Sequence, residues 1–134
     1  MYNEKVMENF KNPKNAGALR GANGVGKVGN AKCGDIMKIY LKINEDEVIE
    51  DATFKTFGCA AAIASTNVAC EMIKGKTVQE ALKLRNSDVI SALGGLPPVK
   101  IHCSILAEEA IEAAIANYYK RKEKSEDASN DDDE

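Results

Sequence analysis

The chain has 134 residues, 44% of them hydrophobic and 29% charged, which is typical of one globular domain. The net charge of −3 and the scarcity of aromatic residues argue against nucleic-acid binding, which usually requires a basic surface. No run of about 20 apolar residues is present to cross a membrane, and no secretory signal is visible, so we expect a cytoplasmic protein. In that compartment the four cysteines, which include no Cys-x-x-Cys pair, should be reduced thiols and not disulfides.

The first part of the chain predicts a short helix followed by a glycine-rich loop. Residues 2–10 place apolar side chains on one side of a helix, and turn-forming residues at 12–17 end it. The five glycines of 17–30 lack the preceding strand and the following helix of a phosphate-binding loop. We therefore expect a mobile loop here, with a strand around Val25–Val28.

The next part of the chain predicts an antiparallel hairpin. Apolar and polar residues alternate from Met37 to Ile43, the pattern of a half-buried strand, and 44–47 form a turn. The returning strand covers 48–57. Its expected core residues are Ile49, Ala52, Phe54 and Phe57. In a hairpin the start of the first strand lies beside the end of the second. We therefore expect Cys33, which precedes the first strand, and Cys59, which follows the second, to lie at the same end of the sheet.

A helix of small residues is predicted to open at Gly58-Cys59 and to end near Lys74, with Gly75 in the C-terminal cap position. Cys70 lies eleven residues after Cys59 on this helix, which corresponds to about 16 Å at the helical rise. Two ligands of one tetrahedral metal ion lie only about 3–4 Å apart. Cys70 is therefore excluded from a site built on Cys59, and we interpret it as a packing residue.

Three further helices complete the prediction. Thr77–Glu80 matches a capping box that opens one short helix, and a second starts at Ser87. A long amphipathic helix is expected from Cys103 to about Lys122. Residues 125–134 are acidic and contain no large apolar side chain, so we expect a disordered tail there.

Three of the cysteines occupy the ends of predicted elements: Cys33 precedes a strand, and Cys59 and Cys103 start helices. His102 adjoins Cys103, and Asp35 follows Cys33 by two residues, on the same side of an extended segment. The positive end of a helix dipole lowers the pKa of a thiol and favours the thiolate. Three thiolates with an imidazole or a carboxylate complete a tetrahedral set for Zn²⁺ or an iron–sulfur cluster. Five candidate ligands for four positions suggest a site that releases what it binds.

Several short motifs follow one another along residues 2 to about 120. They are Tyr2, Asn12–Gly17 (NPKNAG), Gly29–Asp35 (GNAKCGD), Phe54–Cys59 (FKTFGC), Leu96–Lys100 (LPPVK) and Ile101–Glu108 (IHCSILAE). Together they resemble the IscU/NifU N-terminal type of iron–sulfur cluster assembly scaffold. The resemblance implies an α+β, SufE/NifU/IscU-like fold with a small antiparallel three-stranded sheet packed against about four to five helices. We expect the scaffold domain to cover 1–124 and the tail 125–134.

The resemblance also implies the function. A transient 2Fe-2S cluster would form from iron and from persulfide sulfur supplied by a cysteine desulfurase of the IscS/NifS type, and would then pass to acceptor apoproteins. The implied ligands are Cys33, Asp35, Cys59, His102 and Cys103. Cys103 is the first candidate for the persulfide acceptor, because of its imidazole neighbour and the helix dipole, and Cys33 is the second.

Further expectations concern the protein partners, the oligomeric state and the metal bound in the absence of a cluster. The segment Leu96-Pro97-Pro98-Val99-Lys100 would be recognised by Hsp70/J-type chaperones that promote cluster release. We expect a carrier and not an enzyme, a monomer or homodimer, with Zn²⁺ as an occupant of the site in the cluster-free protein.

Other interpretations stay open at this point. On the same fold, a zinc-bound sulfur-transfer protein would use the same thiolates, although that branch typically lacks the Leu96–Lys100 segment and has another residue in place of His102. A zinc hydrolase would need Asp35 or a similar group as a general base. In a non-catalytic interaction module the cysteines would merely be packed, and replacing Cys33, Cys59 or Cys103 by serine would leave the metal content unchanged.

Overall fold

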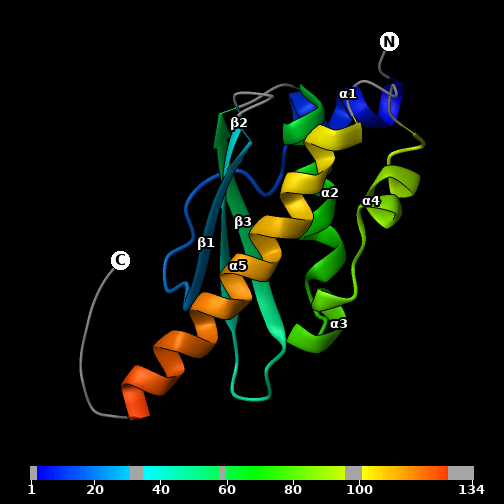
Figure 1. Cartoon of the computed structure of the whole chain (residues 1–134). Coiled ribbons are helices and arrows are strands. Elements are labelled where there is room, and N and C mark those ends of the chain that lie inside the picture. The colour runs from blue at the N-terminus through cyan, green and yellow to red at the C-terminus, as the bar shows by residue number, and fades with distance from the viewer. Residues whose placement is uncertain (1–2, 31–34, 58–59, 96–100, 127–134) are drawn as a thin grey trace.

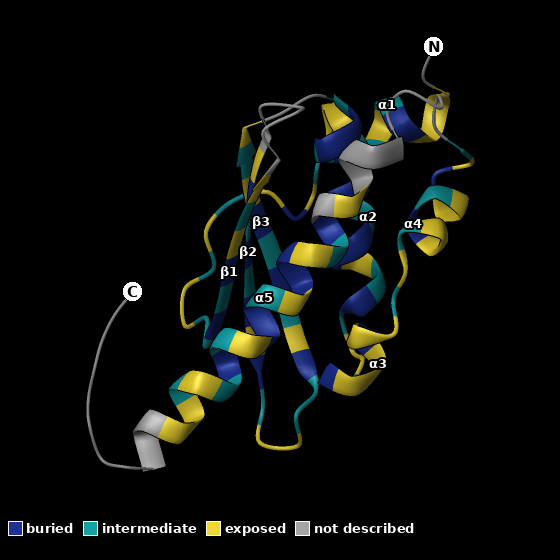
Figure 2. Ribbon diagram, in the orientation of Figure 1, coloured by how far each residue is buried: buried dark blue, intermediate teal, exposed yellow. Residues whose placement is uncertain are grey.

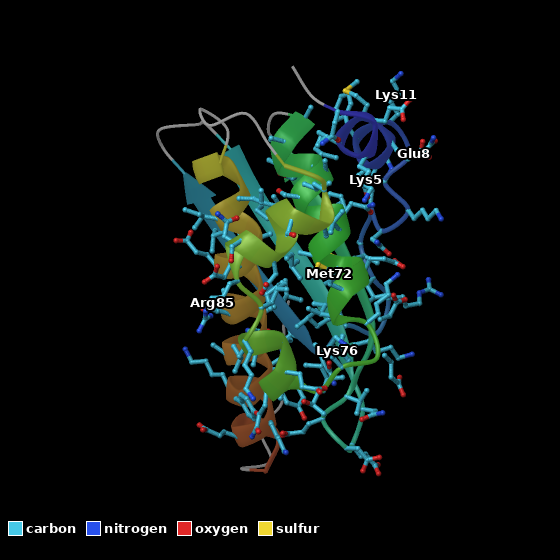
Figure 3. The ribbon with its side chains drawn as sticks, turned by 90° about the vertical axis from the view of Figure 1, so that its right-hand side faces the viewer. Lys5, Glu8, Lys11, Met72, Lys76 and Arg85 are labelled. Carbon is cyan, nitrogen blue, oxygen red and sulfur yellow. The ribbon has the colours of Figure 1, made fainter. Side chains whose placement is uncertain are left out.

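The computed structural model describes residues 3–30, 35–57, 60–95 and 101–126, with the backbone alone at 30, 35, 101–104, 106 and 124–126. Three strands and five helices lie within these residues. In chain order they are α1 (Glu4–Lys11), β1 (Gly24–Asn30), β2 (Asp35–Ile43), β3 (Ile49–Phe57), α2 (Ala60–Ile73), α3 (Val78–Leu82), α4 (Asn86–Ala92) and α5 (Ile101–Glu126). The expected α+β architecture is confirmed, with the helices gathered on one side of the sheet (Figure 1) and therefore in front of it in the turned view (Figure 3).

The sheet is antiparallel, in the order β1-β2-β3, so β2 is the central strand. Met37, Ile39 and Leu41 of β2 are completely buried, whereas Ile36 is 42% exposed. Alternate residues of a strand point to opposite faces, so this alternation identifies the face of the sheet that the helices cover. Figure 2 shows buried residues interspersed with more exposed ones along the strands, and the prediction of a half-buried hairpin is confirmed.

One of the core residues predicted for β3 is wrong. Ala52 and Phe54 are buried as expected, but Phe57 is 79% exposed. Phe57 is three residues from Phe54, and an odd spacing on a regular strand directs two side chains to opposite faces. Ile49 is nevertheless buried, because a change of register beside Lys42 inserts one extra residue in β3.

The glycine-rich segment is more ordered than expected. Residues 24–30 form a complete edge strand, longer than the predicted Val25–Val28. Before it, the chain pairs with β3: the Phe54 N–H donates to the Asn15 carbonyl at 2.9 Å, and the Gly17 N–H donates to the Phe54 carbonyl at 2.7 Å. The expected loop is therefore limited to the residues between this contact and β1.

The helix boundaries mostly match the predictions. Gly75, at φ +83°, follows the end of α2, and the capping box of Thr77 and Glu80 is formed. Helix α5 begins at Ile101, two residues before the expected start, and continues to Glu126, so the first two residues of the predicted tail are helical. Residues 127–134 lie outside the described residues. No described helix combines the length and the hydropathy of a membrane span.

Candidate functional site

The predicted ligands fall at the boundaries of the elements. Asp35 is the first residue of β2, and His102 and Cys103 are the second and third residues of α5. Only the backbone is described at these three positions. Cys33 and Cys59 lie outside the described residues, as does the segment Leu96–Lys100.

One end of the sheet collects the termini of all three strands. Asn30, the last residue of β1, is the Cα partner of Asp35, and Ile36 is the partner of Phe57, the last residue of β3. Helix α2 begins at Ala60, three residues after β3 ends. The β1–β2 and β3–α2 connections therefore join described residues at the same end of the sheet. Cys33 and Cys59, which the hairpin prediction concerns, lie outside the described residues.

The N-terminus of α5 lies at that same end. Gly24 of β1 approaches Ala114 and Tyr118, and Gly26 approaches Ala110 and Ala113, so the helix runs antiparallel to the strand. Following β1 for four residues from Gly26 to its end covers about 13 Å. Following α5 from Ala110 back to Cys103, seven residues earlier, covers about 10 Å. The first turn of α5 and the end of β1 are consequently level, and Figure 1 shows the starts of α2 and α5 at one end of the molecule.

Electrostatics at this end favour anionic ligands. The first turns of α2 and α5 contain no acidic residue. The N-terminus of each helix carries free N–H groups and the positive end of its dipole. Thiolates and carboxylates that are held here would be stabilised in their charged forms, which are the forms that bind metals.

Apolar side chains surround this end of the sheet, a feature that the sequence interpretation did not identify. Phe57 is 79% exposed, Ile36 is 42% exposed, and Ile105, in the second turn of α5, is 38% exposed. The alternation along β2 was the available signal for Ile36, because it assigns the buried face to Met37. Exposed apolar groups beside a site are typical of surfaces that contact another protein.

The interpretation of Cys70 as a packing residue is confirmed. Its side chain is completely buried in the core, and burial raises the pKa of the thiol well above its ordinary value. Elsewhere among the described side chains, no group of three His, Cys, Asp or Glu residues is close enough to hold a metal ion. None of the five predicted ligands has a described side chain, so that observation does not bear on the predicted ligand set.

Comparison with known proteins shows which family and which relatives this chain is similar to. Residues 1–125 match the family described as NifU-like N terminal domain. The iron-sulfur cluster assembly scaffold protein IscU 1 of Archaeoglobus fulgidus is 53% identical over 124 residues, covering 92% of this chain and 80% of that protein. The protein named iron-sulfur cluster assembly scaffold protein IscU of Escherichia coli K12 is 50% identical over 125 residues, covering 91% and 97%.

Solved structures show the same fold. A putative iron-sulfur cluster assembly scaffold protein for the SUF system, from Fervidobacterium islandicum AW-1, superposes with a TM-score of 0.71 at 30% identity, covering 85% of this chain and 96% of that one. A NifU-like N-terminal protein of Brucella abortus gives a TM-score of 0.70 at 20% identity, covering 89% and 94%. Because the family match extends over nearly the whole chain, the protein belongs to the NifU-like N-terminal domain family.

Proposed function

We propose that this protein is a scaffold on which an iron–sulfur cluster is assembled and from which it is transferred to acceptor apoproteins. The single observation that carries the proposal is the convergence of Asp35, the end of β3 and the first turn of α5 at one end of the sheet. Relatives that are about half identical over most of this chain bear the name of iron–sulfur cluster assembly scaffolds.

The cluster is the cargo of the protein, and we propose five ligands for it. They are Cys33, Asp35, Cys59, His102 and Cys103. A 2Fe-2S cluster has four terminal ligand positions, so three thiolates leave one position for which the carboxylate and the imidazole compete. A hard oxygen ligand binds such a soft centre weakly, and this weakness would assist release.

The sulfur would arrive as a persulfide on a cysteine desulfurase. The thiolate of Cys103 attacks the terminal sulfur of the donor persulfide, a new S–S bond forms on Cys103, and the donor cysteine leaves as a thiolate. Two electrons from a thiol or a reduced electron carrier then convert that sulfur to sulfide. Mass spectrometry of single-cysteine variants after treatment with desulfurase tests the assignment. Absence of the added sulfur on Cys103 refutes it, and Cys33 is then the next candidate.

Protein partners follow from the same proposal. The desulfurase must bring its persulfide to this end of the sheet, where Ile36 and Phe57 offer exposed apolar surface. The Leu96–Lys100 segment immediately precedes α5, and we propose it as the recognition motif for an Hsp70-type chaperone that promotes release.

Anaerobic reconstitution with iron, cysteine and a desulfurase tests the scaffold function. The protein should gain visible absorption, with iron and sulfide in equal amounts. Serine at position 33, 59 or 103 should reduce loading severely, whereas Cys70→Ser, a buried cysteine outside the proposed ligand set, is the matched control and should load normally. Equal loading of all four variants would refute the ligand set. Zinc in the isolated protein should fall in the same three variants, because Zn²⁺ uses the same donors.

A further inference from the structure

We propose that Gly26 is a positioning residue for the cluster site, because it sets how closely α5 approaches the sheet. The inference rests on the proposed function and adds to it a residue outside the ligand set. Gly26 is buried in the middle of β1, on the face that α5 covers, and takes no part in the predicted ligand motifs.

The packing around Gly26 leaves no room for a side chain. A Cβ added there would lie 2.5 Å from the carbonyl oxygen of Ala110 and 2.8 Å from the carbonyl carbon of Ala113, and closer still to the backbone nitrogen of Ala114. All three are backbone atoms of α5, so no rotation of a side chain can relieve the contact. Non-bonded heavy atoms need about 3.5 Å, so a side chain at 26 requires the helix to move outward by roughly 1 Å.

A separate contact fixes the helix along its own axis. The Val25 N–H donates to Oδ1 of Asn117 at 3.0 Å, from the outer edge of the edge strand. One turn further along, the Arg121 guanidinium donates to the Ala22 carbonyl at 3.3 Å. Helix α5 is thus attached to β1 and to the segment just before it through the middle and C-terminal part of its length, while its first turn extends about 10 Å beyond the Gly26 contact.

A shift at Gly26 is therefore transmitted to the ligands on α5. His102 and Cys103 are carried by the rigid helix, whereas Asp35 belongs to the sheet, so the spacing of the two groups depends on the separation of helix and strand. Metal–ligand distances tolerate only about 0.2 Å of variation. A displacement of roughly 1 Å would prevent the helix ligands and the sheet ligands from binding one metal centre together.

Gly24 provides an internal comparison. A Cβ at Gly24 would lie 2.8 Å from the Ala114 carbonyl oxygen and 3.1 Å from Cβ of Tyr118, so the overlap is smaller than at Gly26. It also lies two residues further from the ligand end of β1. Gly24→Ala should therefore disturb the site in the same direction as Gly26→Ala, but less.

The test uses Co²⁺ as a spectroscopic probe, because its thiolate charge-transfer bands report how many cysteines bind it. Gly26→Ala, Gly24→Ala and the parent are compared with Ile73→Ala, which creates a core cavity at the end of α2 farthest from the site. All are measured at a temperature at which circular dichroism shows them folded.

We expect Gly26→Ala to bind Co²⁺ about 10-fold or more weakly than the parent, with weaker thiolate bands, and Gly24→Ala to be intermediate. Ile73→Ala should lose stability but keep the affinity and spectrum of the parent. A folded Gly26→Ala protein with the parent's affinity and spectrum overturns the inference. If Gly26→Ala does not fold, Gly24→Ala decides in the same way. A parent that binds neither Co²⁺ nor a cluster would refute the proposed function itself.

Discussion

Ile36 and Phe57 are Cα partners across β2 and β3, and both side chains are exposed. The pair lies on the face of the sheet opposite the helices, at the same end as Asp35 and the first turn of α5. Phe57 is thus exposed, whereas Phe54, only three residues earlier in the same strand, is buried in the core.

This difference between Phe54 and Phe57 is directly testable. Phe54→Ala should lower the free energy of unfolding by about 3–5 kcal/mol, because it removes a buried aromatic side chain and leaves a cavity. Phe57→Ala should change it by about 0.5 kcal/mol or less, because the side chain is mostly in water. Urea unfolding of both variants measures the contrast, and similar losses in the two would contradict the assignment of faces.

Asp35→Ala should trap the cluster. Replacing the hard oxygen ligand removes the weak member of the proposed set, so transfer to an acceptor apoprotein should slow about 10-fold, a rise of about 1.4 kcal/mol in the barrier. The decay of the scaffold's visible absorption in the presence of an apo-ferredoxin measures the rate. Asp51→Ala, a sheet carboxylate at the opposite end of β3, is the matched control. Transfer at the parental rate by Asp35→Ala would exclude the carboxylate from release.

Cys70 should be chemically inert in the folded protein. Its thiol is completely buried and its pKa is raised, so the reactive thiolate is scarce at neutral pH. Iodoacetamide should leave Cys70 unlabelled until urea unfolds the chain, as peptide mass spectrometry would show. Because the folded pKa is the higher one, the thiol's contribution to stability is present at neutral pH and declines above the ordinary value of 9.0. Cys70→Ala should weaken that alkaline decline, and an equal decline would disprove the assignment.

Glu71 should contribute to stability in a pH-dependent way. The Asn15 side chain donates to the Glu71 carboxylate at 3.2 Å, and the Lys74 ammonium donates to it at 3.3 Å. Both bonds lower the pKa of Glu71, and the bond from Asn15 has the larger effect. A lowered folded pKa gives stability that is present above the ordinary value of 4.5 and is lost as the pH falls through the folded pKa. Glu71→Gln should therefore lose less stability than the parent between about pH 5 and pH 3. Urea unfolding across this range is the measurement, with the exposed Glu50→Gln as control.

Asn3 should couple the start of α1 to the end of α4. Its Oδ1 accepts from the Val6 N–H at 2.9 Å, capping α1, while its Nδ2 donates to the Leu93 carbonyl at 2.9 Å. Asn3→Ala should cost about 1 kcal/mol through loss of the cap, and Asn3→Ser should retain most of that stability. The Gly95 N–H donates to the Ile90 carbonyl at 2.9 Å at the end of α4. Both variants lose the bond to Leu93, so this amide should exchange with solvent faster in both. Exchange at the parental rate in Asn3→Ser would show that this bond does not restrain the end of α4.

Much of the secondary structure could be predicted from the sequence because it depends on local spacing. Examples are the alternation from Met37 to Ile43, the capping box at Thr77 and the glycine after α2. Each depends only on residues that are close together in the chain. The motifs that resemble the cluster scaffolds are also local. They are sufficient to indicate the family and the candidate ligands without any tertiary geometry.

Other features depend on tertiary contacts and could not be predicted from the spacing of neighbouring residues. Residues 24–30 contain three glycines and would be a weak strand by propensity, yet they form an edge strand because the backbone of α5 packs directly against Gly26. The burial of Ile49 depends on a register change, and the level at which α5 meets the sheet depends on Asn117. These features arise from contacts between residues far apart in the chain, so the sequence determines which groups can serve as ligands, and only packing determines how closely they approach.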